Sequence, residues 1–254
     1  MAARNNAEWC DAFCRTHGIA GRFRAESWSS PVRTPPQNPD AVTLLPGVEV
    51  EHLLRGIDRS EGCSRDSFAD LDLTAAGFRP LFEAEWLYEA SGNARAAFGR
   101  RWSTLTTEQQ LGEWESTWAG STDASRAFRP ALLLDDAIGV LARYDGGRIV
   151  AGAVANRSAT VIGLSNVFDA AGDLESAWLG GAAAAKALWG QMPVVGYDSG
   201  ASSRRCSSSG VRQHRRPRRV VEGAFGSPHP RVRLPVLSGG PSGGPSELAL
   251  TRPR

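Results

Sequence analysis

Val140-Leu-Ala-Arg-Tyr-Asp-Gly-Gly-Arg-Ile-Val-Ala-Gly-Ala-Val154 contains two apolar runs on either side of the turn Asp145-Gly146-Gly147. Glycine accepts the positive φ that tight hairpins require, so this turn between two β-rich runs predicts a hairpin of residues 138–144 and 149–155. After a polar Asn-Arg-Ser break, residues 159–167 form a third run of the same kind. The stretch therefore predicts an antiparallel sheet of at least these strands.

Helical signals flank this sheet on both sides. Thr106 or Thr107 precedes a run in which Leu111, Trp114 and Trp118 recur at three- and four-residue steps, which predicts a capped amphipathic helix. Asp173 is placed to cap a second helix that extends to about residue 189. Residues 193–197 then predict a short buried strand.

The order helix, long gap, antiparallel strands, helix and strand over residues 103–198 resembles the GNAT (Gcn5-related N-acetyltransferase) fold. The resemblance depends on Trp102, Glu113-Trp114-Glu115, the hairpin stretch, residues 173–189 and Val194-Val-Gly-Tyr197. It implies an α/β fold with a mixed, mainly antiparallel sheet flanked by helices. It also implies an N-acyltransferase that uses acetyl-CoA or another acyl-CoA and acts on a small-molecule amine.

The GNAT family binds the pyrophosphate of CoA with a loop of the form Arg/Gln-x-x-Gly-x-Gly/Ala before a helix N-terminus. The corresponding segment here, Asn166-Val-Phe-Asp-Ala-Ala-Gly-Asp-Leu-Glu175, keeps one glycine and contains three carboxylates. By position alone, Val167, Gly172 and Asp173 are the cofactor-binding candidates. The alternative is a noncatalytic GNAT-like module that binds a ligand or a protein and has lost the pyrophosphate loop.

No catalytic residue of the family can be transferred by motif. Glu83 and Glu85 alternate with apolar residues on a predicted strand and are candidates for a general base. Tyr197 is a candidate proton donor to the leaving thiolate, as tyrosines after the fifth strand are in some GNAT enzymes. Each candidate also has a structural interpretation, as a solvated acid of a half-exposed strand or as a core tyrosine.

Residues 1–90 precede the GNAT-like unit and predict an α+β extension or a degenerate first repeat of the same fold. The expected elements are helices at 7–17, 48–57 and 67–76, the last ending at Gly77, and strands at 23–28, 41–45 and 78–88. Residues 91–101 are small and polar and predict a linker. Residues 102–200 then form the GNAT-like domain.

The charge pattern changes after Gly200. Positions 201–254 hold 11 of the chain's 29 basic residues and two of its 27 acidic residues, with one aromatic residue and Ser-Gly-Gly-Pro repeats. Such a segment buries too little apolar surface to fold alone, so a disordered basic tail is predicted. Its arginines offer a second alternative function, nucleic-acid binding through phosphate contacts, although nucleic acid is the less favoured partner.

A frameshift near residues 199–205 is another interpretation of this tail. One permitted set of codons for residues 211–221, read from the second base, encodes Phe-Asp-Ser-Ile-Gly-Asp-Leu-Val-Val-Trp. That peptide has a glycine turn followed by a strand, which the GNAT order requires at this point. The GNAT-like domain would then be truncated in the sequence as it stands.

Other classes of site are weakly indicated. Cys10, Cys14 and His17 share one face of a helix, and Asp66, Asp70 and Asp72 are clustered, but neither set has the spacing of a metal site, so no metal is predicted. Four cysteines without regular spacing and the lack of a long apolar run predict a cytoplasmic protein with no membrane association.

Overall fold

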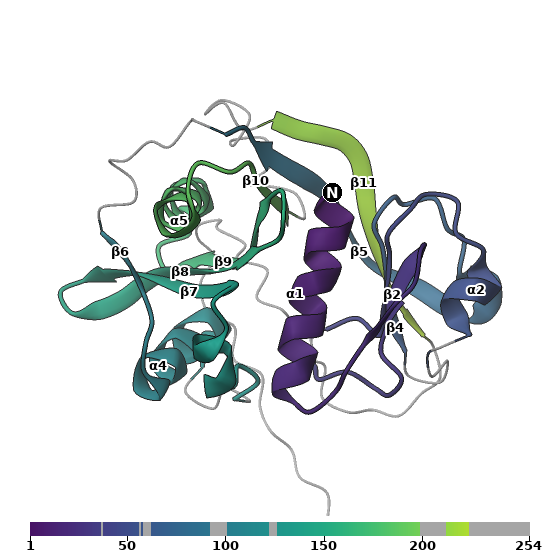
Figure 1. The fold of residues 1–254 in the computed structure, drawn as a ribbon, viewed down its shortest axis with the longest axis horizontal. Helices are drawn as coiled ribbons and strands as arrows, with labels where there is room; N and C mark the ends of the chain where they lie inside the picture. The colour runs from purple at the N-terminus through teal and green to yellow at the C-terminus, as the bar shows by residue number, and fades with distance from the viewer. Residues whose placement is uncertain are drawn as a thin grey trace, which may run out of the picture.

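One continuous sheet organises the molecule (Figure 1), in the strand order β1-β2-β3-β4-β11-β5-β10-β9-β8-β7-β6. The computed structural model describes residues 1–36, 38–55, 57, 62–91, 101–121, 126–198 and 212–223, the last as backbone alone. The strands are β1 (Arg22–Phe23), β2 (Ser27–Ser29), β3 (Ala41–Thr43), β4 (Cys63–Asp66), β5 (Phe78–Glu89), β6 (Trp102–Thr104), β7 (Ile138–Asp145), β8 (Arg148–Arg157), β9 (Ile162–Asp169), β10 (Val194–Asp198) and β11 (Arg212–Gly223). The helices are α1 (Ala2–Thr16), α2 (Val50–Leu54), α4 (Glu108–Ala119) and α5 (Leu174–Trp189), with 3-10 turns at Thr74–Ala76 and Pro130–Leu134.

The predicted hairpin forms the middle of the C-terminal half. β7 and β8 pair antiparallel around the turn, where Gly146 and Gly147 have φ angles of 54° and 80°. β8 pairs antiparallel with β9, and β9 pairs parallel with β10. The predicted antiparallel sheet is therefore confirmed.

Two helices cover opposite faces of this half (Figure 1). α4 begins at Thr107, whose hydroxyl accepts from the Gln110 N–H while the Gln110 side chain accepts from the Thr107 N–H, a reciprocal cap. Trp114 on α4 is fully buried against Phe128 and Phe168. On the other face, α5 begins after the Asp173 cap and packs its alanine-rich side on β8. The predicted mixed α/β fold is confirmed.

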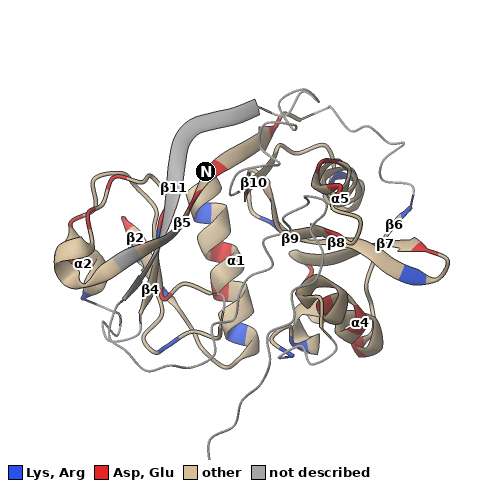
Figure 2. Cartoon of the chain, turned by 180° about the vertical axis from the view of Figure 1, so that it is seen from behind, with Lys and Arg blue, Asp and Glu red and all other residues tan. Residues whose placement is uncertain are grey.

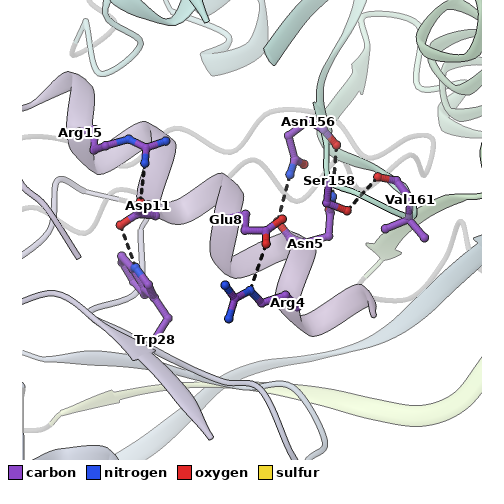
Figure 3. Close-up of polar contacts among 9 residues, drawn as sticks. All are labelled: Arg4, Asn5, Glu8, Asp11, Arg15, Trp28, Asn156, Ser158 and Val161. Atoms are coloured by element: carbon purple, nitrogen blue, oxygen red, sulfur yellow. Dashed lines mark hydrogen bonds and ion pairs between the residues drawn. The ribbon is translucent and has the colours of Figure 1, made fainter. Parts of the chain in front are cut away.

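α1 lies between the two halves of the molecule (Figure 1) and contacts both. Phe13 packs edge-on against Phe128, 5.4 Å between ring centroids. On the N-terminal side, the Asp11 carboxylate accepts from Trp28 Nε1 at 3.0 Å (Figure 3). It also accepts from the Gly21 N–H at 3.1 Å. The helix begins at Ala2, five residues before the predicted start, and shares one core with the C-terminal half.

β5 joins the two halves. Its C-terminal part pairs antiparallel with β10, from Glu85 opposite Asp198 to Glu89 opposite Val194. The fully buried Lys186 of α5 donates to Glu89 Oε1 at 2.6 Å and to the Ala90 carbonyl at 3.0 Å. A strand that was expected in a separate extension therefore completes the sheet beside β10. Residues 92–100 of the predicted linker lie outside the described residues.

The predicted helix at 67–76 is wrong. The segment is a loop with one 3-10 turn at Thr74–Ala76, although it does end at Gly77 in the left-handed conformation. The cause is the fully buried Asp66, whose carboxylate accepts from the N–H groups of Phe68 at 3.0 Å and Leu71 at 2.9 Å. A side chain that binds the amides of the following residues competes with helix formation.

Part of the predicted disordered tail is ordered as a strand. Residues 212–223 form β11, which pairs antiparallel with β4 on one side and β5 on the other. The prediction of a disordered tail considered side chains alone, whereas the edges of β4 and β5 offer backbone hydrogen bonds to any extended chain. Residues 201–211 and 224–254 lie outside the described residues.

Candidate functional site

The loop from Asn166 to Glu175 connects β9 to α5 and is built around Asp169. This carboxylate is 1% exposed and accepts from the N–H groups of Ala171 at 2.8 Å and Asp173 at 3.3 Å. Arg143 on β7 donates Nη2 to its second oxygen at 2.5 Å. The loop N–H groups that precede α5 therefore already donate to a carboxylate of the chain itself.

The three predicted cofactor-binding residues take separate positions in this loop. Val167 is half-buried and packs against the core beneath α5. Gly172 has a φ of 80° and makes the turn, with no atom within 4 Å of where a Cβ would stand. Asp173 accepts from the Ser176 N–H at 3.2 Å, which confirms its predicted role as the helix cap.

A small space remains where β9 and β10 separate. The two strands pair through Ile162, Gly163 and Leu164 and then diverge, and the first turn of α1 covers the opening. Asn5 and Asn156 hold this turn in place by donating to each other's backbone carbonyls at 3.2 and 3.0 Å (Figure 3). A Cβ on Gly163 would stand 1.9 Å from Asn5 Oδ1, so only glycine admits α1 here.

We call this space the β9–β10 pocket. Its cavity volume is about 10 Å³, room for about one water molecule and far below the roughly 300–1,000 Å³ of typical ligand pockets. The lining includes Asn5, Asn6, Ser165 and Tyr197. Arg65 on β4 lies beside it, because its guanidinium contacts Asn6 Oδ1 at 2.7 Å and lies over the Tyr197 ring with 5.4 Å between Cζ and centroid.

Solved structures match the chain over most of its length, whereas no protein-family model and no curated protein matches it. A GCN5-related N-acetyltransferase from Kribbella flavida has a TM-score of 0.56 at 16% identity, covering 89% of this chain and 96% of that one. A protein assigned to the GNAT acetyltransferase family from Novosphingobium aromaticivorans has a TM-score of 0.53 at 15% identity, covering 85% and 96%. The chain has a GNAT-like fold. At these identities the likeness concerns the fold and not the activity.

The loop of this GNAT-like fold does not fit the pyrophosphate of CoA. Asp169 already binds two of the N–H groups that an anion would need, and the Asp173 side chain binds a third, on Ser176. A phosphate would also meet the negative charges of Asp169 and Asp173. Two like charges 4 Å apart repel by about 4 kcal/mol at an effective dielectric constant of about 20.

The catalytic candidates lie on neighbouring strands but on opposite faces of the sheet. Glu83 and Glu85 are exposed on β5, and Tyr197 is half-buried on β10. Tyr197 pairs with Trp86, whereas Glu85 pairs with Asp198. Because successive side chains of a strand alternate between faces, the glutamates and the tyrosine do not converge on one reacting group.

The described residues include no group of three or more His, Cys, Asp or Glu side chains that could hold a metal ion. Cys10 and Cys14 are buried in α1, and His17 lies 2.8 Å from the Ala127 carbonyl through Nε2. Burial raises the pKa of both thiols, that of Cys14 to about 12. Within the described part of the chain, no helix has the length and apolar character needed to cross a membrane.

The arginines of the tail do not form a separate arm where the structure describes them. Residues 212–219 belong to β11, between β4 and β5. Figure 2 colours the ribbon by residue type, and basic and acidic residues are interspersed along its described elements. Nucleic-acid binding therefore gains no support from this segment.

Three residues of the site were missed at the sequence level. Asp169 is one of the three carboxylates noted in the 166–175 segment, but its position before Ala-Ala-Gly is also that of a side chain that binds the amides of its own turn. Arg143 gave no signal, because it pairs with Asp169 from a strand 26 residues earlier. Arg65 is likewise an isolated arginine in a short strand.

Proposed function

We propose that the chain is a noncatalytic GNAT-like binding module that does not bind acyl-CoA through the 166–175 loop. The observation that supports this proposal is the buried Asp169 carboxylate, which satisfies the amides of Ala171 and Asp173 from within the chain. Arg143 neutralises that carboxylate, so the loop needs no external anion.

The geometry around the β9–β10 pocket supports the same proposal. Asn5 and Asn156 anchor the first turn of α1 over the point where the strands diverge, and the cavity that remains is about 10 Å³, the size of one water molecule. A long, flexible cofactor needs a continuous groove that ends at the helix cap. Here the chain's own side chains occupy both the 166–175 loop and the point where β9 and β10 diverge.

Acyl-CoA-dependent transfer to a small amine is the second candidate. It is favoured by the likeness to two solved structures named as acetyltransferases, which this chain covers to 96% of their length. For this function the Asp169 carboxylate would have to leave its amides, and Glu83, Glu85 or Tyr197 would have to approach the acceptor. The present positions of these side chains favour the noncatalytic proposal.

Calorimetric titration of the full chain with acetyl-CoA separates the two candidates. We expect no saturable heat and no thermal shift at about 1 mM ligand, a concentration that reveals even weak sites. An Asp169→Ala variant frees two amides and removes a charge, and we expect measurable CoA binding to appear in it. The exposed turn acid in Asp145→Asn is the matched control and should behave as wild type. Saturable binding to the wild-type chain would refute the noncatalytic proposal.

A further inference from the structure

A leucine projects into solvent just before β7 begins. Leu134 ends the 3-10 turn Pro130–Leu134, and its side chain is 85% exposed. Leu132 of the same turn is buried in the core, and the Ala137 N–H donates to Asp135 Oδ1 at 2.9 Å in the next turn. The backbone on both sides of Leu134 is therefore anchored, while the side chain itself has little contact with the protein.

A hollow lies beside this leucine, and we call it the Trp189 hollow. Its lining residues are Ala137, Arg157, Ser158, Ala159, Trp189 and Met192. Its volume is about 430 Å³, and the Trp189 and Met192 side chains in its wall are half-buried. Trp189 Nε1 donates to the Asp136 carbonyl at 3.2 Å, so the hollow begins two residues from Leu134.

Opposite charges accompany the leucine and the hollow. Arg157 is exposed, and its Cζ lies 5.9 Å from the centroid of the Trp189 ring. Asp136 is exposed next to the projecting leucine. Neither charge forms an ion pair with a residue in the part of the chain that the structure describes. One end of the molecule thus presents an apolar projection with an acid and an apolar hollow with a cation.

The chemistry of the wall favours a protein side chain over a small polar ligand. Ser158 Oγ already donates to the Val161 carbonyl at 3.0 Å, and Trp189 Nε1 is already used as well. Small-molecule sites usually have several convergent polar groups, whereas this wall offers apolar surface and one cation. A leucine followed closely by a carboxylate matches such a wall, and Leu134 with Asp136 has that chemistry.

We propose that two copies of the chain associate through this end of the molecule. Leu134 of each copy enters the Trp189 hollow of the other, and Asp136 of each copy pairs with Arg157 of the other. Such a contact is isologous, because both copies use the same surface, and it closes at a dimer. Burial of the leucines favours association, and the two ion pairs set the register.

This inference is independent of the proposed function. Arg157 is opposite Ile162 at the start of β9, whereas the 166–175 loop follows the end of that strand. Association is measured without acetyl-CoA, so either result leaves the test of the loop unchanged.

Sedimentation velocity of the full chain from about 1 to about 200 μM tests the proposal. We expect the sedimentation coefficient to rise with concentration to that of a dimer and no further. A monomer over the whole range overturns the second copy as the occupant of the hollow. Larger oligomers overturn the proposal as well, because an isologous contact is used up in the dimer.

Leu134→Asp assigns the association to this surface. It places a charge in an apolar hollow and should weaken the dimer at least about thirtyfold, as expected for the loss of a central interface side chain. Leu45→Asp changes a leucine of the N-terminal half that is 49% exposed, and this matched control should associate as wild type. Both side chains are exposed, so the fold is retained. An undiminished dimer in Leu134→Asp overturns the assignment.

Charge reversal tests the pairing between copies. Arg157→Asp and Asp136→Arg should each weaken the dimer about tenfold or more, because each brings like charges together. An equimolar mixture of these two variants should restore association, since every pair between copies then has opposite signs. Arg148→Asp, an exposed position at the other end of β8, should associate as wild type. A mixture that stays monomeric overturns the proposed pairing.

Discussion

Asp169 and Arg65 are both more than nine-tenths buried, but the chain compensates only one of them. Asp169 receives two backbone N–H groups and the Arg143 guanidinium, whereas the hydrogen-bond acceptors of Arg65 are an amide oxygen and a thiol. A buried charge with a full set of partners is compensated by the protein itself, whereas a buried charge with neutral contacts alone carries a desolvation cost. The N–H groups of the 166–175 loop are therefore already used by Asp169, and Arg65 is the less compensated charge among the described residues.

The Lys186–Glu89 pair gives the strongest test of this contrast. Lys186→Met leaves the Glu89 carboxylate buried without its cation, and we expect a loss of about 3–5 kcal/mol in the free energy of unfolding. Urea unfolding measures it. The double variant Lys186→Met/Glu89→Leu removes both charges and should recover much of the loss. A single-variant loss below about 1 kcal/mol would show that buried charges here need no partner.

Arg143→Met should have a smaller effect. Asp169 keeps its two N–H donors, so we expect a loss of about 2–3 kcal/mol, the contribution of a hydrogen bond between charged groups. Arg148→Met on the neighbouring strand removes an exposed arginine and is the control for urea unfolding. Equal stability of the two variants would contradict the role assigned to Arg143.

Arg65→Met, in contrast, should cost little or no stability. Removing an uncompensated buried charge while keeping most of the volume should change the unfolding free energy by no more than about 1 kcal/mol, or should stabilise the chain. Urea unfolding of the variant and the wild type measures the difference. A loss of about 3 kcal/mol or more would mean that a counter-charge inside the protein is already in place.

The buried thiols should change the free energy of unfolding at alkaline pH and leave it unchanged at pH 7. The pKa of Cys14 is raised to about 12 by burial, above that of the unfolded chain. The folded state therefore keeps a proton that the unfolded state loses, so stability is fully present below about pH 9 and falls by up to about 1.4 kcal/mol per pH unit as the pH rises toward 12. Cys14→Ala should reduce this slope, and the buried Cys10, whose pKa is also raised, should account for part of what remains. Rapid alkylation of Cys10 at pH 7 would indicate a thiolate, and with it a counter-ion for Arg65.

Much of the fold could be predicted because local signals agreed with the final positions. The Asp-Gly-Gly turn, the Thr107 cap and the Asp173 cap each act within a few residues, and each appears in the structure. The helix expected at 67–76 failed because the buried Asp66 carboxylate redirects the amides that follow it. The place of β5 beside β10 depends on pairing across more than a hundred residues, which no local pattern encodes.

The candidate site was less predictable for the same reason. The departure of the 166–175 loop from the family pattern was visible in the sequence, but its cause, an ion pair from β7, was not. The position of β11 could not be predicted either. A strand with neighbours on both sides rarely contains proline, whereas residues 212–219 contain Pro217 and five arginines. We propose that a shifted frame encodes a better-suited strand here. Resequencing the locus tests this, and an intact frame that encodes the arginines would refute a sequencing error.

The order of strands in the sheet has a consequence for synthesis. β5 leaves the ribosome more than a hundred residues before β10, its partner along the edge from Glu85 to Glu89. At roughly 5–20 residues per second, that partner follows about 5–20 s later. During this interval the nascent chain has a long strand with open hydrogen-bonding groups, which makes it a substrate for chaperones before it is a folded protein.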